Sequence, residues 1–125
     1  MIHNPVGWFE IYVQDMARAQ KFYETVLGKK LTELKSPAGE IEMRAFPMEK
    51  DAMGCTGALA KMQGVKSGGN SVIIYFICAD CAVEAGRVKA AGGSVFKPKM
   101  SIGQYGFIAL ATDTEGNMFG LHSMK

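Results

Sequence analysis

FEIYVQD (residues 9–15) decides the fold of this chain, because IYFICAD (residues 74–80) repeats its pattern in the second half. Each stretch is an apolar run that ends in an aspartate, and apolar residues at the spacing of one helix face follow it. Gly28 and Gly92 come after the two helical segments. An aspartate is a common helix N-cap, and a glycine is a common left-handed C-cap. Both halves therefore predict a strand, an N-cap, a helix and a glycine stop.

Three further strands are predicted after each helix, because the same order of apolar and turn-forming stretches recurs. GVKSGGN (64–70) separates the halves and has the composition of a linker. We predict a single α+β domain over residues 1–125, made of one β-α-β-β-β module at 5–63 and a second at 70–124. Its curled mixed sheets surround a cleft, and its helices lie outside. The predicted strands are 9–15, 31–35, 40–46 and 56–62 in the first module, and 74–80, 94–97, 106–112 and 117–123 in the second.

The composition is that of a globular protein without a nucleic-acid or membrane partner. Of the 125 residues, 48% are hydrophobic and 21% are charged, which is close to the average for folded domains. The formal net charge is +2 and the basic residues are scattered, which argues against a nucleic-acid footprint. The longest apolar run, 72–78, is too short for a membrane span, and we recognise no signal peptide. Three cysteines, an odd number, favour a reducing, cytoplasmic location.

Strand alternation sorts the side chains into a set that packs under the helices and a set that faces the other way. The second set mixes aromatic and ionisable groups. Such side chains could line a cleft that binds a small molecule, or they could face solvent on an open sheet. The alternation is consistent with both interpretations. The predicted core set is Phe9, Ile11, Val13, Ile41, Met43, Ala45, Phe119 and Leu121. The predicted cleft set is Trp8, Glu10, Tyr12, Glu40, Glu42, Arg44, Phe46, Met118, Gly120 and His122.

The paired modules resemble the vicinal oxygen chelate superfamily, which includes glyoxalases, bleomycin resistance proteins and extradiol dioxygenases. The most specific stretches are IYVQD (11–15) with FYETVLG (22–28), and DTEGN (113–117). Residues 46–54 followed by 57–59 also look like the end of the first module in many glyoxalase-like proteins. The resemblance covers essentially the whole chain. It implies a homodimer, since members of this length commonly pair and complete their clefts across the interface.

The resemblance also implies a divalent metal, held by His and Glu at four equivalent strand positions, that acts as a Lewis acid on the substrate. In this chain those positions carry Trp8, Ile73, Ala58 and Gly120. None of these side chains can donate an electron pair to a divalent metal. We therefore expect no cofactor, and we favour a metal-independent, glyoxalase/bleomycin-resistance-like protein that binds a small organic molecule.

Several residues of the predicted cleft could serve such a ligand. Aromatic rings can stack on it, an arginine can pair with a carboxylate, and a Glu–His pair can act as acid and base. The same groups could instead only satisfy one another's charges, so whether the protein is an enzyme stays open. The candidate acid–base pair is Glu10 and His122, and the candidate ligand-binding residues are Trp8, Tyr12, Arg44, Tyr75 and Met118.

One alternative is a displaced metal site built from Glu10, Glu42 and His122. Glu10 and His122 each lie two residues from an expected ligand position, so that they should point the same way. Three such ligands would suffice for a catalytic metal with open positions. The protein would then be a metal-dependent lyase or isomerase, similar to lactoylglutathione lyase, or a dioxygenase.

A third hypothesis is a thiol-redox protein acting through Cys78 and Cys81. CADC (78–81) is a Cys-x-x-Cys at a helix start, where the helix dipole can lower a thiol pKa. Against this, Asp80 would raise that pKa, and Cys78 falls on the strand face assigned to the core. Since only Cys55 remains, no second pair completes a zinc site. Structural thiols are therefore the favoured interpretation.

Overall fold

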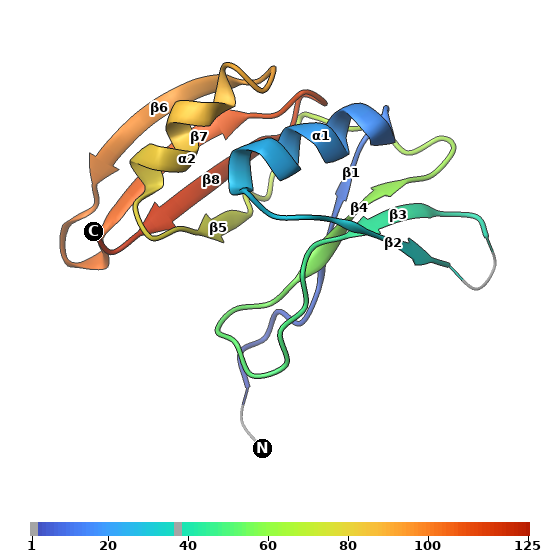
Figure 1. The fold of residues 1–125 in the computed structure, drawn as a ribbon, viewed down its shortest axis with the longest axis horizontal. Helices are drawn as coiled ribbons and strands as arrows, with labels where there is room; N and C mark the ends of the chain where they lie inside the picture. The colour runs from blue at the N-terminus through green and yellow to red at the C-terminus, as the bar shows by residue number, and fades with distance from the viewer. Residues whose placement is uncertain (1–2, 37–38) are drawn as a thin grey trace.

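Each half of the chain builds its own four-stranded sheet with one α-helix beside it (Figure 1). The computed structural model describes residues 3–36 and 39–125. The first half contains β1 (Phe9–Tyr12), α1 (Met16–Leu27), β2 (Thr32–Lys35), β3 (Glu42–Ala45) and β4 (Gly57–Lys61). The second half contains β5 (Tyr75–Ile77), α2 (Cys81–Val88), β6 (Ser94–Ser101), the short 3-10 helix η1 (Gly103–Tyr105), β7 (Phe107–Thr112) and β8 (Met118–Ser123).

The two sheets share one topology, as expected of a duplicated module. Their strand orders are β1-β4-β3-β2 and β5-β8-β7-β6. In each sheet the first and last strands of the module pair in parallel, and the other neighbours are antiparallel. The registers correspond too, because Glu10 lies opposite Ala58 in the first sheet and Tyr75 lies opposite Gly120 in the second. The predicted α+β fold class is confirmed.

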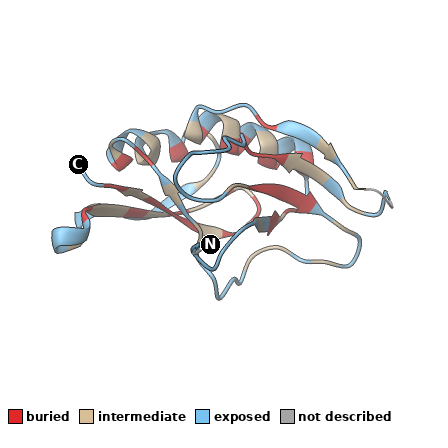
Figure 2. Ribbon diagram, turned by 90° about the horizontal axis from the view of Figure 1, so that it is seen from below, coloured by how far each residue is buried: buried red, intermediate tan, exposed pale blue. Residues whose placement is uncertain are grey.

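Both helices lie on one side of the sheets, while no helix of the described residues covers the other side, which we call the open face (Figure 2). The side chains between helices and sheets form one buried cluster that draws on both halves. Ile11 and Val13 contribute from the first half, and Phe119 and Leu121 from the second. On these strands the predicted core set does face the helices.

The helix starts follow the sequence prediction, but the second helix end does not. Asp15 caps α1 by accepting a hydrogen bond from the Arg18 backbone N–H at 3.0 Å, and Gly28 ends α1 in the left-handed conformation with φ 66°. Asp80 caps α2 by accepting a hydrogen bond from the Ala82 backbone N–H at 3.0 Å. The prediction that Gly92 ends the second helix is wrong, because α2 stops at Val88 and the chain continues through turns.

Those turns bring the chain close to β7. The Gly93 N–H donates to the Val88 carbonyl at 3.0 Å, and a Cβ on Gly93 would lie only 2.3 Å from the Thr112 carbonyl oxygen. A longer helix would not let the backbone approach β7 so closely. The tertiary contact therefore overrides the local glycine signal.

Aromatic rings from both halves meet in the middle of the core. Tyr23 of α1 packs against Phe76 and Phe119 at centroid distances of 5.8 and 5.5 Å. Phe46 packs against Phe76 at 5.5 Å. Rings at such separations add attraction beyond simple area burial. The cluster therefore joins the two halves as well as filling the core.

A buried carboxylate makes a second, polar connection between the halves. The Glu115 side chain is fully buried and accepts hydrogen bonds from the backbone N–H groups of Gln14 and Asp15, at 2.8 and 2.9 Å. Arg18 reaches the same carboxylate with its Nε at 2.7 Å from Oε2. The second half thus holds the start of α1 in the first half.

The rest of the DTEGN loop (113–117) extends this connection. The Tyr23 hydroxyl donates to Asp113 Oδ2 at 2.6 Å, inside the core. Asn117 Nδ2 donates to the Tyr12 carbonyl at 2.9 Å, and Asn117 Oδ1 accepts from the Gly68 N–H at 2.6 Å. We call residues 113–117 the joint loop, because its side chains bond the first half and the linker.

The helices are short. None in the described part of the chain is long and apolar enough to cross a membrane.

Replacing Glu115 with glutamine should destabilise the fold near neutral pH and much less near pH 2. Burial would raise the pKa of this carboxyl, but hydrogen bonds from Arg18, Asp15 and Gln14 outweigh burial and lower the pKa to about 2. A carboxyl whose pKa is lower in the folded state stabilises the fold when the pH is above its pKa in the unfolded state, 4.5. This contribution to the free energy of unfolding is lost as the pH falls towards 2. It amounts to about 3 kcal/mol at pH 7. Urea unfolding at several pH values measures it.

Glu40→Gln is the matched control, because Glu40 is exposed and should show little change at any pH. If the stability gap between the wild type and Glu115→Gln were the same at neutral and strongly acidic pH, the charge of Glu115 would not be what holds the joint loop.

Candidate functional site

Strand β3 presents the opposite face from the one predicted. Arg44 lies opposite Leu59, which is fully buried in the core, and Arg44 Nε donates to Gln20 Oε1 of α1 at 3.2 Å. Phe46 is buried in the same core, and Glu42 bonds Arg44 at 3.2 Å on this side. The assignment of Glu42, Arg44 and Phe46 to the cleft was wrong.

Met43 and Ala45 occupy the open face instead, since they lie opposite Ala60 and Ala58. Alternation separates the two sets of side chains, but it does not say which set is inside, and on β3 the set that is apolar throughout lies outside. Burial of the large Phe46 ring against the aromatic cluster outweighs the burial of smaller side chains. Arg44 can follow it inward because Gln20 and Glu42 accept its donors.

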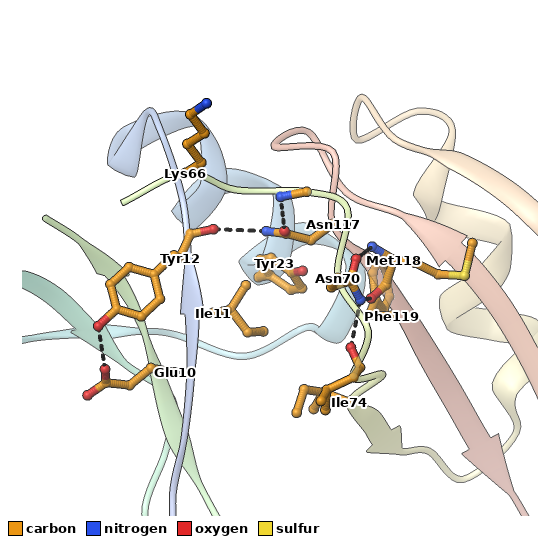
Figure 3. Close-up of a pocket in the computed structure, with 12 residues that line it drawn as sticks. Glu10, Ile11, Tyr12, Tyr23, Lys66, Asn70, Ile74, Asn117, Met118 and Phe119 are labelled. Atoms are coloured by element: carbon orange, nitrogen blue, oxygen red, sulfur yellow. Dashed lines mark hydrogen bonds between the residues drawn. The ribbon is translucent and has the colours of Figure 1, made fainter. Parts of the chain in front are cut away.

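A cavity of about 220 Å³ lies where the two halves meet (Figure 3). We call it the seam cavity. Its walls come from β1, from the start of β8 and from the connecting segment 66–74. Of the predicted ligand-binding or catalytic residues, it brings together Glu10, Tyr12 and Met118. The buried rings of Tyr23 and Phe119 also line it.

The Glu10 carboxylate is held in place by two aromatic donors. The Tyr12 hydroxyl donates to Oε1 at 2.9 Å, and the Trp8 indole N–H donates to Oε2 at 3.3 Å. The hydrogen bond to Glu10 raises the pKa of Tyr12, and burial and the negative charge of Glu10 act in the same direction. Tyr12 therefore stays a neutral donor at physiological pH. Glu10 keeps free lone pairs that a ligand could use.

Three polar residues of the seam cavity were missed by the sequence analysis. They are Lys66, Asn70 and Asn117. Asn70 exchanges two hydrogen bonds with the backbone of Met118, at 3.0 and 3.1 Å, and so fixes the linker against the start of β8. The glycine-rich composition of 64–70 indicates only a linker. The polar side chains of Lys66 and Asn70 within it could have indicated that the linker also contributes to a site.

His122 lies away from Glu10. It sits on β8 four residues beyond Met118, which is about 13 Å along a strand. Its Nε2 lies 2.7 Å from the Tyr105 carbonyl oxygen. The described chain therefore does not assemble Glu10 and His122 as a pair. Alternation places both residues on the open face, but it gives no distance between residues on different strands.

Tyr75 lies away from the seam cavity too, and its ring fills the space above Gly120. The two residues are opposite one another on β5 and β8. A Cβ added at Gly120 would lie 2.2 Å from Cδ1 of Tyr75. A glutamate at this position, which the superfamily resemblance implies, would have no room beside that ring.

The superfamily's metal does not fit the residues present at its usual positions. Trp8, Ile73, Ala58 and Gly120 offer no donor atom, and the Tyr75 ring covers the last of them. The displaced alternative is not assembled either, because Glu42 faces the helices while Glu10 and His122 lie apart. Within residues 3–36 and 39–125, no group of three or more His, Cys, Asp and Glu side chains could hold a metal ion.

The thiols of the Cys-x-x-Cys segment are placed as structural side chains. Cys78 and Cys81 are both buried, and all three cysteines are free. Burial and the nearby Glu84 carboxylate raise the pKa of Cys78 to about 12. Since the thiolate is the nucleophile, this environment disfavours the thiol-redox hypothesis.

Replacing Gly120 with alanine should destabilise the protein by more than about 2 kcal/mol, because the new Cβ collides with the Tyr75 ring. The double variant Tyr75→Ala/Gly120→Ala should recover part of that loss relative to Tyr75→Ala alone. Gly86→Ala is the control, since nothing lies within 4 Å of a Cβ there. Thermal unfolding compares the set. If Gly120→Ala lowered the stability equally in the wild type and in the Tyr75→Ala background, the Tyr75 ring would not be what the new Cβ collides with.

Comparisons with known proteins agree with this fold. Residues 6–37 match a family model described as bleomycin resistance protein-like N-terminal. Among curated proteins, a sequence comparison finds no match for this chain.

Solved structures with similar folds are distant in sequence. Glyoxalase I from Zea mays superimposes with a TM-score of 0.72 at 23% identity, covering 93% of this chain and 43% of that chain. The chain thus spans less than half the length of the maize enzyme. TnmS3, an antibiotic-binding protein from a Streptomyces species, gives 0.68 at 22% identity and covers 98% of both chains. A glyoxalase-related enzyme from Fulvimarina pelagi gives 0.69 at 18% identity, covering 97% of this chain and 88% of that one.

The duplicated topology and the N-terminal match lead to one conclusion: the chain has the fold of the vicinal oxygen chelate superfamily, to which glyoxalases and bleomycin resistance proteins belong.

Proposed function

We propose that this protein binds a small organic molecule in the seam cavity, without a bound metal. The observation that carries the proposal is the Glu10 carboxylate, which Tyr12 and Trp8 hold at the wall of an aromatic-lined cavity. A ligand can donate a hydrogen bond to this carboxylate and stack on the Tyr12 ring. An antibiotic-binding protein of the same fold, TnmS3, supports a binding role.

The ligand is expected to extend from the seam cavity onto the open face. A volume of about 220 Å³ is below the usual range for drug-sized ligands, roughly 300–1,000 Å³. Trp8 lies beside Glu10 and is 39% exposed, which leaves its ring available to a ligand that reaches past the cavity. We do not propose turnover, because His122, the predicted acid–base partner of Glu10, lies instead at the Tyr105 carbonyl.

A second copy of the chain is proposed to cover the open face. Met100 is on the open face, because it lies opposite Ile108, which in turn lies opposite His122. Its side chain is 43% exposed. Exposed apolar side chains gathered on one face are typical of an interface. The resemblance to a superfamily whose small members commonly pair supports a homodimer. The three free thiols support a cytoplasmic location as part of the same proposal.

The binding proposal is tested by titrating a panel of small aromatic amines and amides while recording the fluorescence of Trp8, the single tryptophan. A ligand of the seam cavity should change this fluorescence saturably. Glu10→Gln should weaken its binding about ten-fold, because a hydrogen bond to a charged acceptor is lost.

Glu33→Gln is the matched control, because Glu33 is exposed on β2 of the same sheet and should leave the affinity unchanged. A ligand that binds equally well to the wild type and to Glu10→Gln would place the binding site elsewhere and refute the role given to Glu10.

The dimer proposal predicts that Met100→Glu shifts the protein towards monomer, because an unpaired charge would be buried at the interface. Light scattering after size-exclusion chromatography measures the mass of each species. Met124→Glu is the control, since Met124 is also exposed but follows the last strand. A wild type that is monomeric at high protein concentration would contradict this proposal and leave the seam-cavity proposal intact.

A further inference from the structure

A second and larger hollow runs along β5, away from the Glu10 carboxylate. It lies between β5 and the loop 46–56 that connects β3 to β4, and its volume is about 790 Å³. We call it the β5 groove. This volume is within the usual range for sites of small organic ligands, roughly 300–1,000 Å³. The β5 groove shares only Ile74 with the seam cavity, so the two can be tested separately.

The walls of the β5 groove are apolar and accessible. Met48 and Met53 of the loop are 53% and 87% exposed, and Ile77 of β5 is 65% exposed. A Cβ on Gly54 would lie 3.3 Å from Cδ1 of Ile77, which shows that the loop is seated against the strand. Methionine side chains are flexible and polarizable, and they adapt to ligands of different shape.

The inner end of the β5 groove holds a carboxylate oxygen that lacks a partner. Glu84 of α2 lines the groove, and its Oε1 is buried without accepting a hydrogen bond from any residue that the structure describes. The Cys78 thiol, a weak donor beside this carboxylate, is shared between Glu84 and the Phe76 carbonyl, which lies 3.6 Å from its sulfur. A buried acceptor left unpaired costs free energy, so such an atom calls for an explanation.

The charges around the β5 groove favour a cation at this inner end. Lys29, Glu49 and Lys50 also line the groove, but all three are exposed and can turn into solvent. Among the charged lining residues, Glu84 is the one with a buried carboxylate oxygen. A protonated amine satisfies a carboxylate with both charge and hydrogen bonds.

We propose that the β5 groove is a second binding site, which takes an amine with an apolar body. The ammonium group pairs with the Glu84 carboxylate at the inner end, and the apolar body lies against Met48, Met53 and Tyr75. This site is additional to the seam cavity and does not depend on the function proposed for it.

The test uses hexylamine, with hexanol and hexanoate as probes of equal length and different charge. Isotope-labelled methionine methyl groups report by NMR where each probe binds, once their signals are assigned by single Met→Leu variants. Hexylamine should shift the Met48 and Met53 signals saturably and leave Met118, in the seam cavity, unchanged. Hexanol should bind more weakly than hexylamine, and hexanoate more weakly still.

Glu84→Gln separates recognition by charge from simple burial of the chain. It should weaken hexylamine binding about ten-fold or more, with little effect on hexanol. The thermal stability of the ligand-free protein should not fall, because the replaced oxygen makes no hydrogen bond in the described structure. Glu49→Gln, at the exposed rim, and Glu10→Gln, in the seam cavity, are controls that should leave hexylamine affinity unchanged.

Three outcomes would overturn the proposal. One is hexylamine shifting Met118 instead of Met48 and Met53. Another is equal affinity for hexylamine and hexanoate. The last is an unchanged hexylamine affinity in Glu84→Gln. Loss of seam-cavity binding in Glu10→Gln would bear only on the function proposed above.

Discussion

The Glu115 carboxylate is the interaction on which the arrangement of the two halves depends. It is fully buried, yet two backbone N–H groups and the Arg18 guanidinium satisfy it. A charge without such partners would be too costly to bury, so the carboxylate requires the start of α1 to stay where it is. The aromatic contacts of Tyr23 with Phe76 and Phe119 then fill the space beside it.

The seam cavity is a consequence of this joint. The two sheets meet through the joint loop and the aromatic cluster, and they leave a gap beside β1 that the linker crosses. Asn117 belongs to both features, because it bonds the Tyr12 carbonyl and also lines the cavity. The residues that hold the halves together therefore also shape the place where a ligand would lie.

The chain has the fold of the superfamily, but other side chains occupy the space around the usual metal positions. Where an acidic ligand is expected, Gly120 has no side chain and the Tyr75 ring lies over it. At the equivalent place in the first half, Ala58 lies opposite Glu10. The neighbouring strand β1 carries the Glu10 carboxylate, to which Trp8 and Tyr12 donate hydrogen bonds. The binding proposed for this group needs shape and charge, and it does not need the chelating residues.

The sequence alone determined the duplication, the helix starts at Asp15 and Asp80, and the fold class, because caps and apolar periodicity act over a few residues. It also identified the missing donors at the metal positions. Only the tertiary structure decided which face of β3 is inside, that Glu10 and His122 lie apart, and that Lys66 and Asn70 reach the cavity. These depend on how two sheets pack and how far their strands carry each residue. Alternation records only the side of a strand, and carries no information about the distance across the molecule.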